Sequence, residues 1–415
     1  MVMEISGSME DPHPHYEQLR RLGSVPYDTA GGNYWVLRHD DAISALTNRR
    51  FGKAPLVTDA PLFKVQNLPW LPRLILRLRG VSQKTIAPLT NTMLTRDPPD
   101  HTRLRSLVQR AFTPRTVDRL RPHIERIADD LLDRMSTGRE ADFVTDFAFP
   151  LPATVIAQLI GVPGQDRSKF RHWSQQLIMG VDPTQPSRVR ANAAVAVTQL
   201  LEYFRELVTA RRGHPTNDLL TALIAAEEAH DRLSVDELLG TCQLLLVAGH
   251  ETTTNLIGTG LLRLIRRPDA LEQLRSTSAL LPSAIEELLR FESPVQQVRR
   301  AALEDVEIGN TRIARGQLVI VCLAAANRDS EVFDNPNDLN LGREPNPHLA
   351  FGHGIHFCLG ASLARLEAQI AFGRVLERLK DIQLAGEPVW SSNRVIRSLR
   401  SLPIRYTTHT GPEVG

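Results

Sequence analysis

The segment LLVAGHETTTNL, residues 245–256, places an acid inside an otherwise apolar run. His250 and Glu251 match the beginning of the zinc-protease pattern His-Glu-x-x-His, in which two histidines one helical turn apart bind the metal. Thr254 occupies the position of the second histidine, so the segment does not support a zinc protease. A carboxylate buried among leucines needs a partner, a solvated cavity or a function. Because Gly249 and the following threonines favour a local distortion or the close approach of a ligand, the segment predicts a helix that faces a polar pocket.

A second segment, FGHGIHFCLGASLARLE at residues 351–367, surrounds Cys358 with glycines and histidines. The residues that follow have helical periodicity, so Cys358 precedes a helix N-terminus, where backbone N–H groups and the helix dipole favour a thiolate. Gly352, Gly354 and Gly360 would allow the backbone to approach a large, flat ligand. A single cysteine is most often buried and inert, but that interpretation leaves the three glycines unexplained.

Helices supply most of the framework for these two segments. Helical periodicity predicts helices over residues 113–135, 191–211 and 216–228. The first of these begins with Thr113 as N-cap and Pro114 at the first helical position. Ser234 and Glu237 form a capping box that begins the helix of the LLVAGHETTTNL segment. That helix meets no proline before Pro268, so it would extend for about 45 Å at 1.5 Å per residue.

Strand signals are fewer than helix signals. Apolar and β-branched runs predict strands over 33–38 (NYWVLR) and 317–326 (QLVIVCLAAA), and residues 306–319 predict a hairpin that turns at Gly309-Asn310. Residues 60–92 mix apolar and basic side chains and are expected to form a packed surface loop, a kind of segment that is often functional. The predicted fold class is therefore mainly α with small β-sheets at its sides.

Composition and charge exclude several classes of protein. The chain has 415 residues, of which 42% are hydrophobic, and its formal net charge of +2 argues against a general nucleic-acid-binding protein. Cys242, Cys322 and Cys358 do not form the pattern of a disulfide framework and indicate a reducing compartment. The sequence contains neither a signal peptide nor an apolar run of about 18 residues, so we expect a cytoplasmic protein without a membrane anchor.

The residues around Cys358 resemble the haem-binding signature of the cytochrome P-450 family. FGHGIHFCLG, residues 351–360, matches every fixed position of Phe-Gly-x-Gly-x-x-x-Cys-x-Gly. AGHETT, residues 248–253, resembles the family's oxygen-activation motif in its long central helix. EELLR supplies the family's Glu-x-x-Arg at Glu287 and Arg290. The cysteine motif is highly specific, and the motifs occur in the family's order.

The resemblance extends over most of the chain, from about residue 10 to residue 406. Residues 97–114 resemble the helix that precedes the haem in bacterial members, and residues 326–344 resemble the irregular meander before the cysteine loop. It implies a triangular, mainly helical body with haem b between the long central helix and the helix after the cysteine loop. It also implies that residues 1–415 are a single cytochrome P-450 domain with no fused reductase domain.

The resemblance makes Cys358 the axial thiolate ligand of the haem iron, with Phe351 packed on the proximal face. His101 and Arg105 lie four residues apart, on one helix face, and would bind the haem propionates by charge-assisted contacts. The residues assigned to the haem site are Cys358, Phe351, Gly352, Gly360, His356, His101, Arg105, Ala248 and Arg300, the last of which a shift of one position would exchange for Arg299.

Glu251 and Thr252 would lie on the distal side of the haem and deliver protons during oxygen activation. A hydroxyl that both donates and accepts, backed by a carboxylate that reaches solvent, forms a suitable proton relay. Gly249 would leave room for oxygen. His250 would point away, as a structural or surface-linked residue.

Glu287 and Arg290 would form a structural ion pair, with Arg343 as its third partner. The meander departs from the family pattern at two positions. The family usually has an aromatic residue where Leu339 stands and an acid where Asn340 stands, so we expect slightly altered packing there.

The substrate pocket is the part that the sequence determines least. By resemblance it is lined by residues 60–92, residues 177–181, Leu245, Ala248, Val295, Gln296, Val298, Val395 and Ile396. Gln296 and Gln297 either hydrogen-bond a polar group of the substrate or satisfy backbone groups. Mostly aliphatic walls suit an apolar substrate such as a lipid, terpenoid, steroid or macrolide.

The expected activity is hydroxylation or epoxidation of an apolar small molecule with dioxygen. Electrons from NAD(P)H would arrive through a separate ferredoxin and ferredoxin reductase. Four arginines, Arg103, Arg110, Arg115 and Arg365, would either attract an acidic ferredoxin or form an ordinary solvated face. The alternatives are a peroxide-dependent haem peroxygenase, which the Glu251-Thr252 pair disfavours, and a non-catalytic haem-binding sensor.

Overall fold

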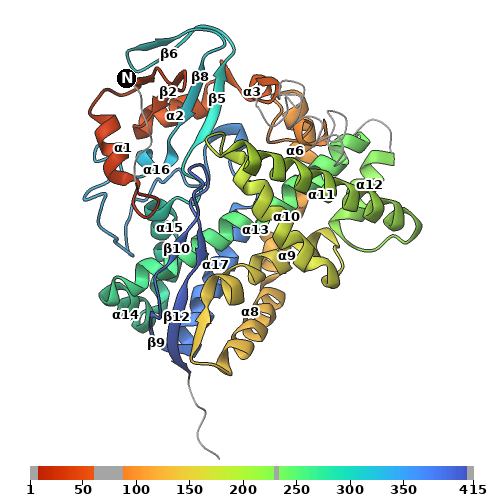
Figure 1. Cartoon of the computed structure of the whole chain (residues 1–415), viewed down its shortest axis with the longest axis vertical. Coiled ribbons are helices and arrows are strands. Elements are labelled where there is room, and N and C mark those ends of the chain that lie inside the picture. The colour runs from red at the N-terminus through yellow and green to blue at the C-terminus, as the bar shows by residue number, and fades with distance from the viewer. Residues whose placement is uncertain (1–7, 60–86, 229–232, 409–415) are drawn as a thin grey trace, which may run out of the picture.

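A computed structural model describes residues 8–59, 87–228 and 233–408, and helices form most of this part of the chain (Figure 1). The helices are α1 (His13–Arg20), α2 (His39–Thr47), α3 (Ala54–Asp59), α6 (Asp100–Gln109), α7 (Pro114–Asp118), α8 (Arg121–Ser136), α9 (Pro150–Ile160), α10 (Arg167–Val181), α11 (Ser187–Gly213), α12 (Leu219–Glu228), α13 (Val235–Ile265), α14 (Pro268–Ser276), α15 (Leu281–Glu292), α16 (Leu323–Ala326) and α17 (Ala361–Arg378). Small sheets accompany them, so the predicted fold class is confirmed.

Helix α13 runs through the middle of the helical body and has 31 residues. The hydroxyl of Ser234 accepts a hydrogen bond from the backbone N–H of Glu237, and the carboxylate of Glu237 accepts one from the N–H of Ser234, so the predicted capping box is present. Residues on nearly all sides of the helix are buried, as expected for a helix that is apolar all round. It packs on α9, α11, α15 and α17 and so forms the centre of the largest core.

The sheets lie at the side of the helical body (Figure 1). The largest has the strand order β1-β2-β8-β5-β3, built from β1 (Tyr27–Asp28), β2 (Asn33–Val36), β3 (Phe51–Gly52), β5 (Val298–Ala302) and β8 (Leu318–Val321). A three-stranded sheet joins β4 (Glu140–Asp142), β12 (Pro403–Thr408) and β9 (Leu379–Leu384). Two pairs complete the set, namely β10 (Val389–Trp390) with β11 (Leu399–Ser401), and β6 (Val306–Ile308) with β7 (Thr311–Ile313). The predicted hairpin at Gly309-Asn310 is confirmed by the pairing of β6 with β7.

Two predicted elements have different boundaries in the structure. The helix predicted over 113–135 is divided into α7 and α8. Pro122 lies in the first turn of α8, where its missing N–H and its ring prevent the hydrogen bond that would continue the preceding helix. The strand predicted over 317–326 ends at Val321, because the alanine-rich residues that follow form α16.

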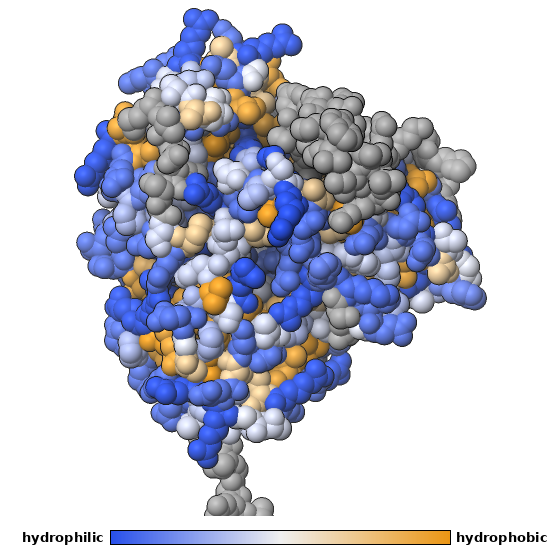
Figure 2. Space-filling model, in the orientation of Figure 1, coloured by the Kyte–Doolittle hydropathy of each residue, from blue (hydrophilic) through white to orange (hydrophobic). Residues whose placement is uncertain are grey.

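The face of the molecule in Figure 2 is mostly hydrophilic, with apolar residues in small separate areas. Within the described ranges, no helix combines the length and the apolar character needed to cross a membrane.

Candidate functional site

Cys358 lies between a short 3₁₀ turn, Gly354–His356, and the first turn of α17. Its N–H donates to the carbonyl of Phe351 at 2.9 Å, which closes the loop around the thiol. Gly352 and Gly354 have φ angles of 71° and 72°, the left-handed region that favours glycine. Gly354 also lies so close to the end of α2 that a Cβ would come within 2.7 Å of the Leu46 carbonyl oxygen. The loop is therefore fixed by backbone contacts.

Burial raises the pKa of the Cys358 thiol above its usual value. The N–H of Gly360 at the start of α17 lowers this pKa, in the direction that the sequence suggested, as do Arg105 and Arg365, but these effects are smaller than that of burial. A metal ion deprotonates a thiol that coordinates it. The charged form of Cys358 therefore depends on a bound cation more than on the helix dipole.

Basic side chains from three separate parts of the chain meet beside this loop. The ring of His101 on α6 packs edge-on against the ring of His356, with centroids 4.5 Å apart. His101 is 3% exposed, and neither of its ring nitrogens has a hydrogen-bond partner among the described residues. Arg300 on β5 is 4% exposed and donates one hydrogen bond, to the carbonyl of Arg299. Donors without partners in a basic cluster are suited to an anionic ligand.

Burial is the main cause of the lowered pKa values in this basic cluster, and neighbouring positive charges add to it for the two histidines. Burial, with the positive charges of Lys53 and Arg300, lowers the pKa of His356 to about 2. Burial also lowers the pKa of Arg300 to about 10, and only the carboxylate of Asp97 opposes this shift. The pKa of His101 is lowered by burial and then by Arg105. Two or more negative charges would oppose these shifts.

Lys53 belongs to the same cluster, although the sequence did not single it out. Burial and the charge of Arg300 lower the pKa of Lys53 to about 7. Asp97 holds the segment in place by accepting hydrogen bonds from the backbone N–H groups of Lys53 and Ala54, at 2.8 and 3.0 Å. Lys53, Asp97 and Arg300 lie far apart in the sequence, so no local sequence motif could have indicated that they form one cluster.

Arg105 is directed toward the cysteine loop. Its guanidinium donates to the carbonyl of Phe357 at 2.8 Å and so joins α6 to the residue before Cys358. On the other side of the loop, the guanidinium of Arg365 lies over the ring of Phe351 at 4.6 Å and pairs with Glu286 at 2.7 Å.

One strip of α13 remains accessible although the rest of the helix is buried. Ala248 is exposed, Leu244, Gly249 and Thr252 are half-buried, and the other residues between 238 and 262 are buried. The spacing of four residues places Leu244, Ala248 and Thr252 on one face. The hydroxyl of Thr252 donates to the carbonyl of Ala248 at 3.4 Å, a long bond that leaves the hydroxyl available to another partner.

The structure corrects the expectation for Gly249 and leaves the structural one of the two alternatives for His250. Gly249 was expected to leave room for oxygen, but a Cβ there would lie 2.7 Å from Ile156 on α9, so the packing of two helices requires the glycine. His250 is 1% exposed, which excludes a surface-linked role. Its Nδ1 lies 2.6 Å from the Leu246 carbonyl oxygen, and its Nε2 lies 3.5 Å from Oε1 of Glu251. The helix itself is continuous through these residues.

Glu287 and Arg290 form a fully buried bidentate pair with two distances of 2.7 Å. Arg343 adds a third cation, with Nε 3.2 and 3.1 Å from the two carboxylate oxygens of Glu287. The N–H of Asn340 also donates to Glu287, at 2.9 Å, while Leu339 is buried in the main core. The meander is therefore anchored on α15.

Residues assigned to the substrate pocket are only partly available to a ligand. Val295 and Val298 are half-buried, Leu245 and Ile396 are buried, and Val295 forms an isolated β-bridge with Ile396. Gln296 satisfies backbone groups rather than a polar group of the substrate. Its amide N–H groups donate to the carbonyls of Glu292 and Ser293, and its amide oxygen accepts a hydrogen bond from the hydroxyl of Tyr16. Residues 60–86 of the predicted loop lie outside the described residues, whereas Ala87–Thr90 form a short 3₁₀ turn against α13.

The geometry agrees with comparisons to known proteins. The family model for cytochrome P450 matches residues 77–395, more than half of the chain. The chain belongs to the cytochrome P450 family. It is accordingly a cytochrome P450 monooxygenase, an oxidoreductase, and the family implies a haem cofactor.

Relatives of this P450 cover nearly its whole length. It is 45% identical over 406 residues to cytochrome P450 107B1 of Saccharopolyspora erythraea, covering 95% of both chains. It is 40% identical to PksS of Bacillus subtilis, described as a polyketide biosynthesis cytochrome P450, over 96% of this chain and 94% of that one. The crystal structure of P450BioI, in complex with an acyl carrier protein that bears hexadec-9Z-enoic acid, has a TM-score of 0.86 at 35% identity, covering 96% of this chain and 99% of that one.

The residues of the P450 site fit a haem. Haem iron accepts a cysteine thiolate, and Cys358 precedes α17. A Cβ built on Gly360 would have no heavy atom within 4 Å, so the backbone next to the thiol is open to a flat ligand. The two propionates match the cluster of Lys53, His101, Arg300 and His356.

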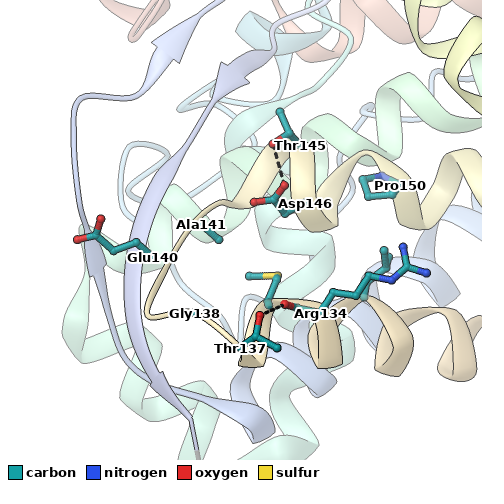
Figure 3. A pocket seen from close by; sticks show the side chains of 10 residues that line it. Arg134, Thr137, Gly138, Glu140, Ala141, Thr145, Asp146 and Pro150 are labelled. Carbon is teal, nitrogen blue, oxygen red and sulfur yellow. Dashed lines mark hydrogen bonds between the residues drawn. The ribbon is translucent and has the colours of Figure 1, made fainter.

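The surface hollow in Figure 3 is separate from these residues. It has a volume of about 450 Å³ and is lined by residues of α8, β4 and the turn that leads into α9, among them Arg134, Thr137, Glu140 and Asp146. Thr145 and Asp146 bond to each other, and the hydroxyl of Thr137 donates to the backbone of Arg134. Thr137, Thr145 and Asp146 are thus satisfied locally, and none of the residues that line the hollow belongs to the candidate site.

A carboxyl group that the sequence did not identify lies between α17 and α13. Glu367 is fully buried, and neither of its oxygens has a well-formed hydrogen bond within the described part of the chain. Burial raises its pKa well above the usual carboxyl range, opposed only by the hydroxyl of Thr253 on α13. Burial of Glu367 therefore favours its protonated form.

This protonation predicts a pH-dependent gain of stability for Glu367→Gln. The unfolded chain releases the proton above about pH 4.3, whereas the folded chain keeps it, so folding loses stability as the pH rises. Glutamine does not titrate, so the variant avoids this loss. The free energy of unfolding of the variant should exceed that of the wild type, and the difference should be larger at pH 8 than at pH 5. Urea denaturation at several pH values measures it. Glu377→Gln on the exposed side of α17 should leave the pH dependence unchanged, and a parallel shift at all pH values would contradict the prediction.

Proposed function

We propose that this P450 is a haem-thiolate monooxygenase that hydroxylates or epoxidises an apolar small molecule, with electrons from a separate ferredoxin and ferredoxin reductase. The observation that carries the proposal is the combination of Cys358 at the start of α17 with an accessible strip in the buried middle of α13 and a buried basic cluster in which the ring nitrogens of His101 lack a well-formed hydrogen bond among the described residues. A haem b at this position would supply the chemistry of dioxygen activation. We further propose that residues 1–415 act as one domain.

The haem would be held without a covalent link. Cys358 would be the axial ligand, with Phe351 and Arg365 packed behind the thiolate. The propionates would be bound by His101, His356 and Arg300, through charge-assisted hydrogen bonds. Arg105 would act mainly by fixing the Phe357 carbonyl beside the ligand. Gly352 and Gly360 would let the loop approach the ring, and Ala248 would contact its other face.

Thr252 and Glu251 would conduct protons toward the distal side. Thr252 belongs to the accessible strip, and its hydroxyl both donates and accepts. The side chain of Glu251 is 10% exposed, so the carboxylate can exchange protons with water while most of it is shielded. General acid catalysis by such a pair contributes about 10²- to 10⁴-fold.

The substrate would be an apolar molecule of the lipid, terpenoid, steroid or macrolide class. Ala248, Leu245, Val295, Val298 and Ile396 offer no charge, which supports an apolar ligand. The names of PksS and of the P450BioI complex make polyketides and fatty acyl compounds the first candidates to test.

The docking face for the ferredoxin would rely on two of the four arginines that the sequence suggested. Arg103 pairs with Glu237, and Arg365 pairs with Glu286, so their charges are partly neutralised. Arg110 and Arg115 are exposed and make no ion pair within the described residues. These two arginines would attract an acidic partner.

Thr252→Ala tests the proposal. We expect electron consumption to continue while the product formed per electron falls several-fold, because oxygen is reduced to peroxide or water when the proton relay is incomplete. The measurement compares NADPH consumed, peroxide released and product formed in a reconstituted system with ferredoxin and its reductase. Thr259→Ala, on the same helix with its hydroxyl bonded to the Asn255 carbonyl, is the matched control and should stay coupled.

The same assay separates the alternatives. Turnover with hydrogen peroxide but none with the ferredoxin system would indicate a peroxygenase. Bound haem without turnover of any tested substrate, and no effect of Thr252→Ala on electron use, would indicate a sensor. An unchanged ratio of product to electrons in Thr252→Ala would contradict the relay.

A further inference from the structure

His250 makes three contacts that together define its chemical state. Its Nδ1 lies 2.6 Å from the carbonyl oxygen of Leu246, one turn earlier on α13. Its ring packs edge-on against Phe149, with centroids 5.4 Å apart. Its Nε2 lies 3.5 Å from Oε1 of Glu251. A carbonyl oxygen only accepts hydrogen bonds, so Nδ1 carries a hydrogen and donates it.

If the His250 ring is neutral and the Glu251 carboxylate is ionised, no hydrogen lies between Nε2 and Oε1. A neutral ring with its hydrogen on Nδ1 has a bare Nε2, and an ionised carboxylate has only acceptor atoms. Nε2 and Oε1 are both shielded from water and have no other hydrogen-bond partner among the described residues. Two buried acceptors that face each other without a hydrogen between them are both left unsatisfied, which is unfavourable. One proton between them satisfies both.

We propose that His250 and Glu251 share this proton, and that His250 is the residue that positions and reloads Glu251 in the distal relay. The inference rests on the proposed function for its role in catalysis, but its structural part does not. With the shared proton on the imidazole side, both ring nitrogens carry a hydrogen and Nε2 donates to the carboxylate of Glu251. A neutral pair of opposite charges is also less costly to bury than a lone carboxylate.

The surroundings of the pair are consistent with a stored proton. Helix α9, which packs on this side of α13, has no charged residue in Pro150–Ile160. The guanidinium of Arg171 also contacts the Phe149 ring, 5.0 Å from its centre, and is the cation that shares this ring with His250. Glu367 faces Thr253 instead, on the side of α17. Glu251 is thus the carboxylate that His250 meets directly.

The transfer needs only a small movement. Nε2 and Oε1 are 3.5 Å apart, and a hydrogen bond of this type is usually about 2.7–3.2 Å, so a slight rotation of the Glu251 side chain closes the gap. The proton then moves from Nε2 to Oε1, and the ring returns to the neutral form with its hydrogen still on Nδ1. No electrons are exchanged, and water restores the proton through the exposed part of Glu251. This places a proton donor one residue from Thr252.

The test reads the protonation of His250 directly. Protein labelled with ¹⁵N-histidine and prepared as the diamagnetic ferrous carbonyl form is examined by long-range ¹H–¹⁵N NMR near pH 7.5. The chain has 13 histidines, and the spectrum of His250→Gln identifies the signals of this residue. We expect both ring nitrogens to have the shifts of N–H groups in the wild type and only Nδ1 to do so in Glu251→Gln. A bare Nε2 in the wild type that does not respond to Glu251→Gln would overturn the inference.

A kinetic cycle tests the catalytic part. His250→Phe keeps the contact with Phe149 but has no ring nitrogen, and it should lower the product formed per electron several-fold. Combining it with Glu251→Gln should cause little further loss, because both changes interrupt one pathway. Additive losses, or full coupling in His250→Phe, would remove His250 from the relay. His250→Gln retains one donor toward Glu251 and should recover part of the coupling.

The two hypotheses fail in different ways. If Nε2 is bare while Thr252→Ala still uncouples the enzyme, the shared proton is disproved and the proposed function stands. If Nε2 carries the proton but neither Glu251→Gln nor Thr252→Ala changes coupling, the relay is disproved and the pair is purely structural.

Discussion

Replacing Cys358 with serine is expected to abolish monooxygenase activity and to remove the strongly red-shifted Soret band of the reduced, carbon monoxide-bound protein. A serine hydroxyl has no low-energy anionic form that could replace the thiolate, and the burial that raises the pKa of Cys358 would disfavour an alkoxide even more. The difference spectrum of purified protein, with haem content measured separately, provides the measurement.

Cys322→Ala serves as the control for this change. Cys322 is fully buried next to α16, and burial raises its pKa to about 12, so it behaves as a small apolar residue. The control should keep the red-shifted band, even if its thermal stability is somewhat lower. A red-shifted band that persists in Cys358→Ser would mean that another group ligates the iron, and the assignment of the cysteine loop would be wrong.

The parts of the fold that the sequence predicted well depend on local chemistry. The capping box at Ser234 and the N-cap at Thr113 are formed by residues three positions apart, so they can be recognised without a tertiary structure. The turn at Gly309-Asn310 is equally local. Pro122 within residues 113–135 is a local signal for a division into two helices. The apolar periodicity continues across this proline and therefore predicted a single helix.

The parts that the sequence did not predict depend on contacts between distant segments. Gly249 looks like a glycine that serves a ligand, and only the position of Ile156 shows that it serves helix packing. Gln296 looks like a polar residue available to the substrate, until Tyr16, 280 positions away, is seen to donate to it. Lys53 joins the basic cluster because Asp97 holds its backbone. In each case the residue that determines the role lies in a different part of the chain, so the sequence around Gly249, Gln296 or Lys53 does not indicate it.

The electrostatics of the site also required the structure. The sequence suggested that a helix start would stabilise the thiolate of Cys358, but burial has the larger effect on its pKa. The same burial acts on the cations beside the loop and lowers the pKa of His356 to about 2. A ligand with a central metal cation and two peripheral carboxylates, such as a haem, would oppose both effects of burial.

Glu287→Ala is expected to have the largest effect on stability, a loss of about 3–5 kcal/mol in the free energy of unfolding. The carboxylate accepts hydrogen bonds from Arg290, Arg343 and the Asn340 N–H, and its removal leaves two buried guanidinium groups without their counter-charge. Arg290 in turn donates to the carbonyls of Asn327 and Pro336, which shape the meander. Chemical denaturation measures the loss, and haem release should accelerate with it, because the meander leads directly into the cysteine loop.

A comparison of Glu287→Ala with Glu286→Ala distinguishes the effect of burial from the effect of charge pairing. Glu286 occupies the same helix and also has cationic partners, Arg365 and His348, but its side chain is 29% exposed. Burial alone would raise its pKa, yet hydrogen bonds from these partners prevail and lower it to about 2. The stability that Glu286 contributes is therefore present at neutral pH and disappears as the pH falls from the usual carboxyl range toward 2. At pH 7 the loss in Glu286→Ala should be smaller than in Glu287→Ala, since water can solvate the arginine left behind. Equal losses in the two variants would show that the number of ion pairs, rather than their burial, determines how firmly the meander is held.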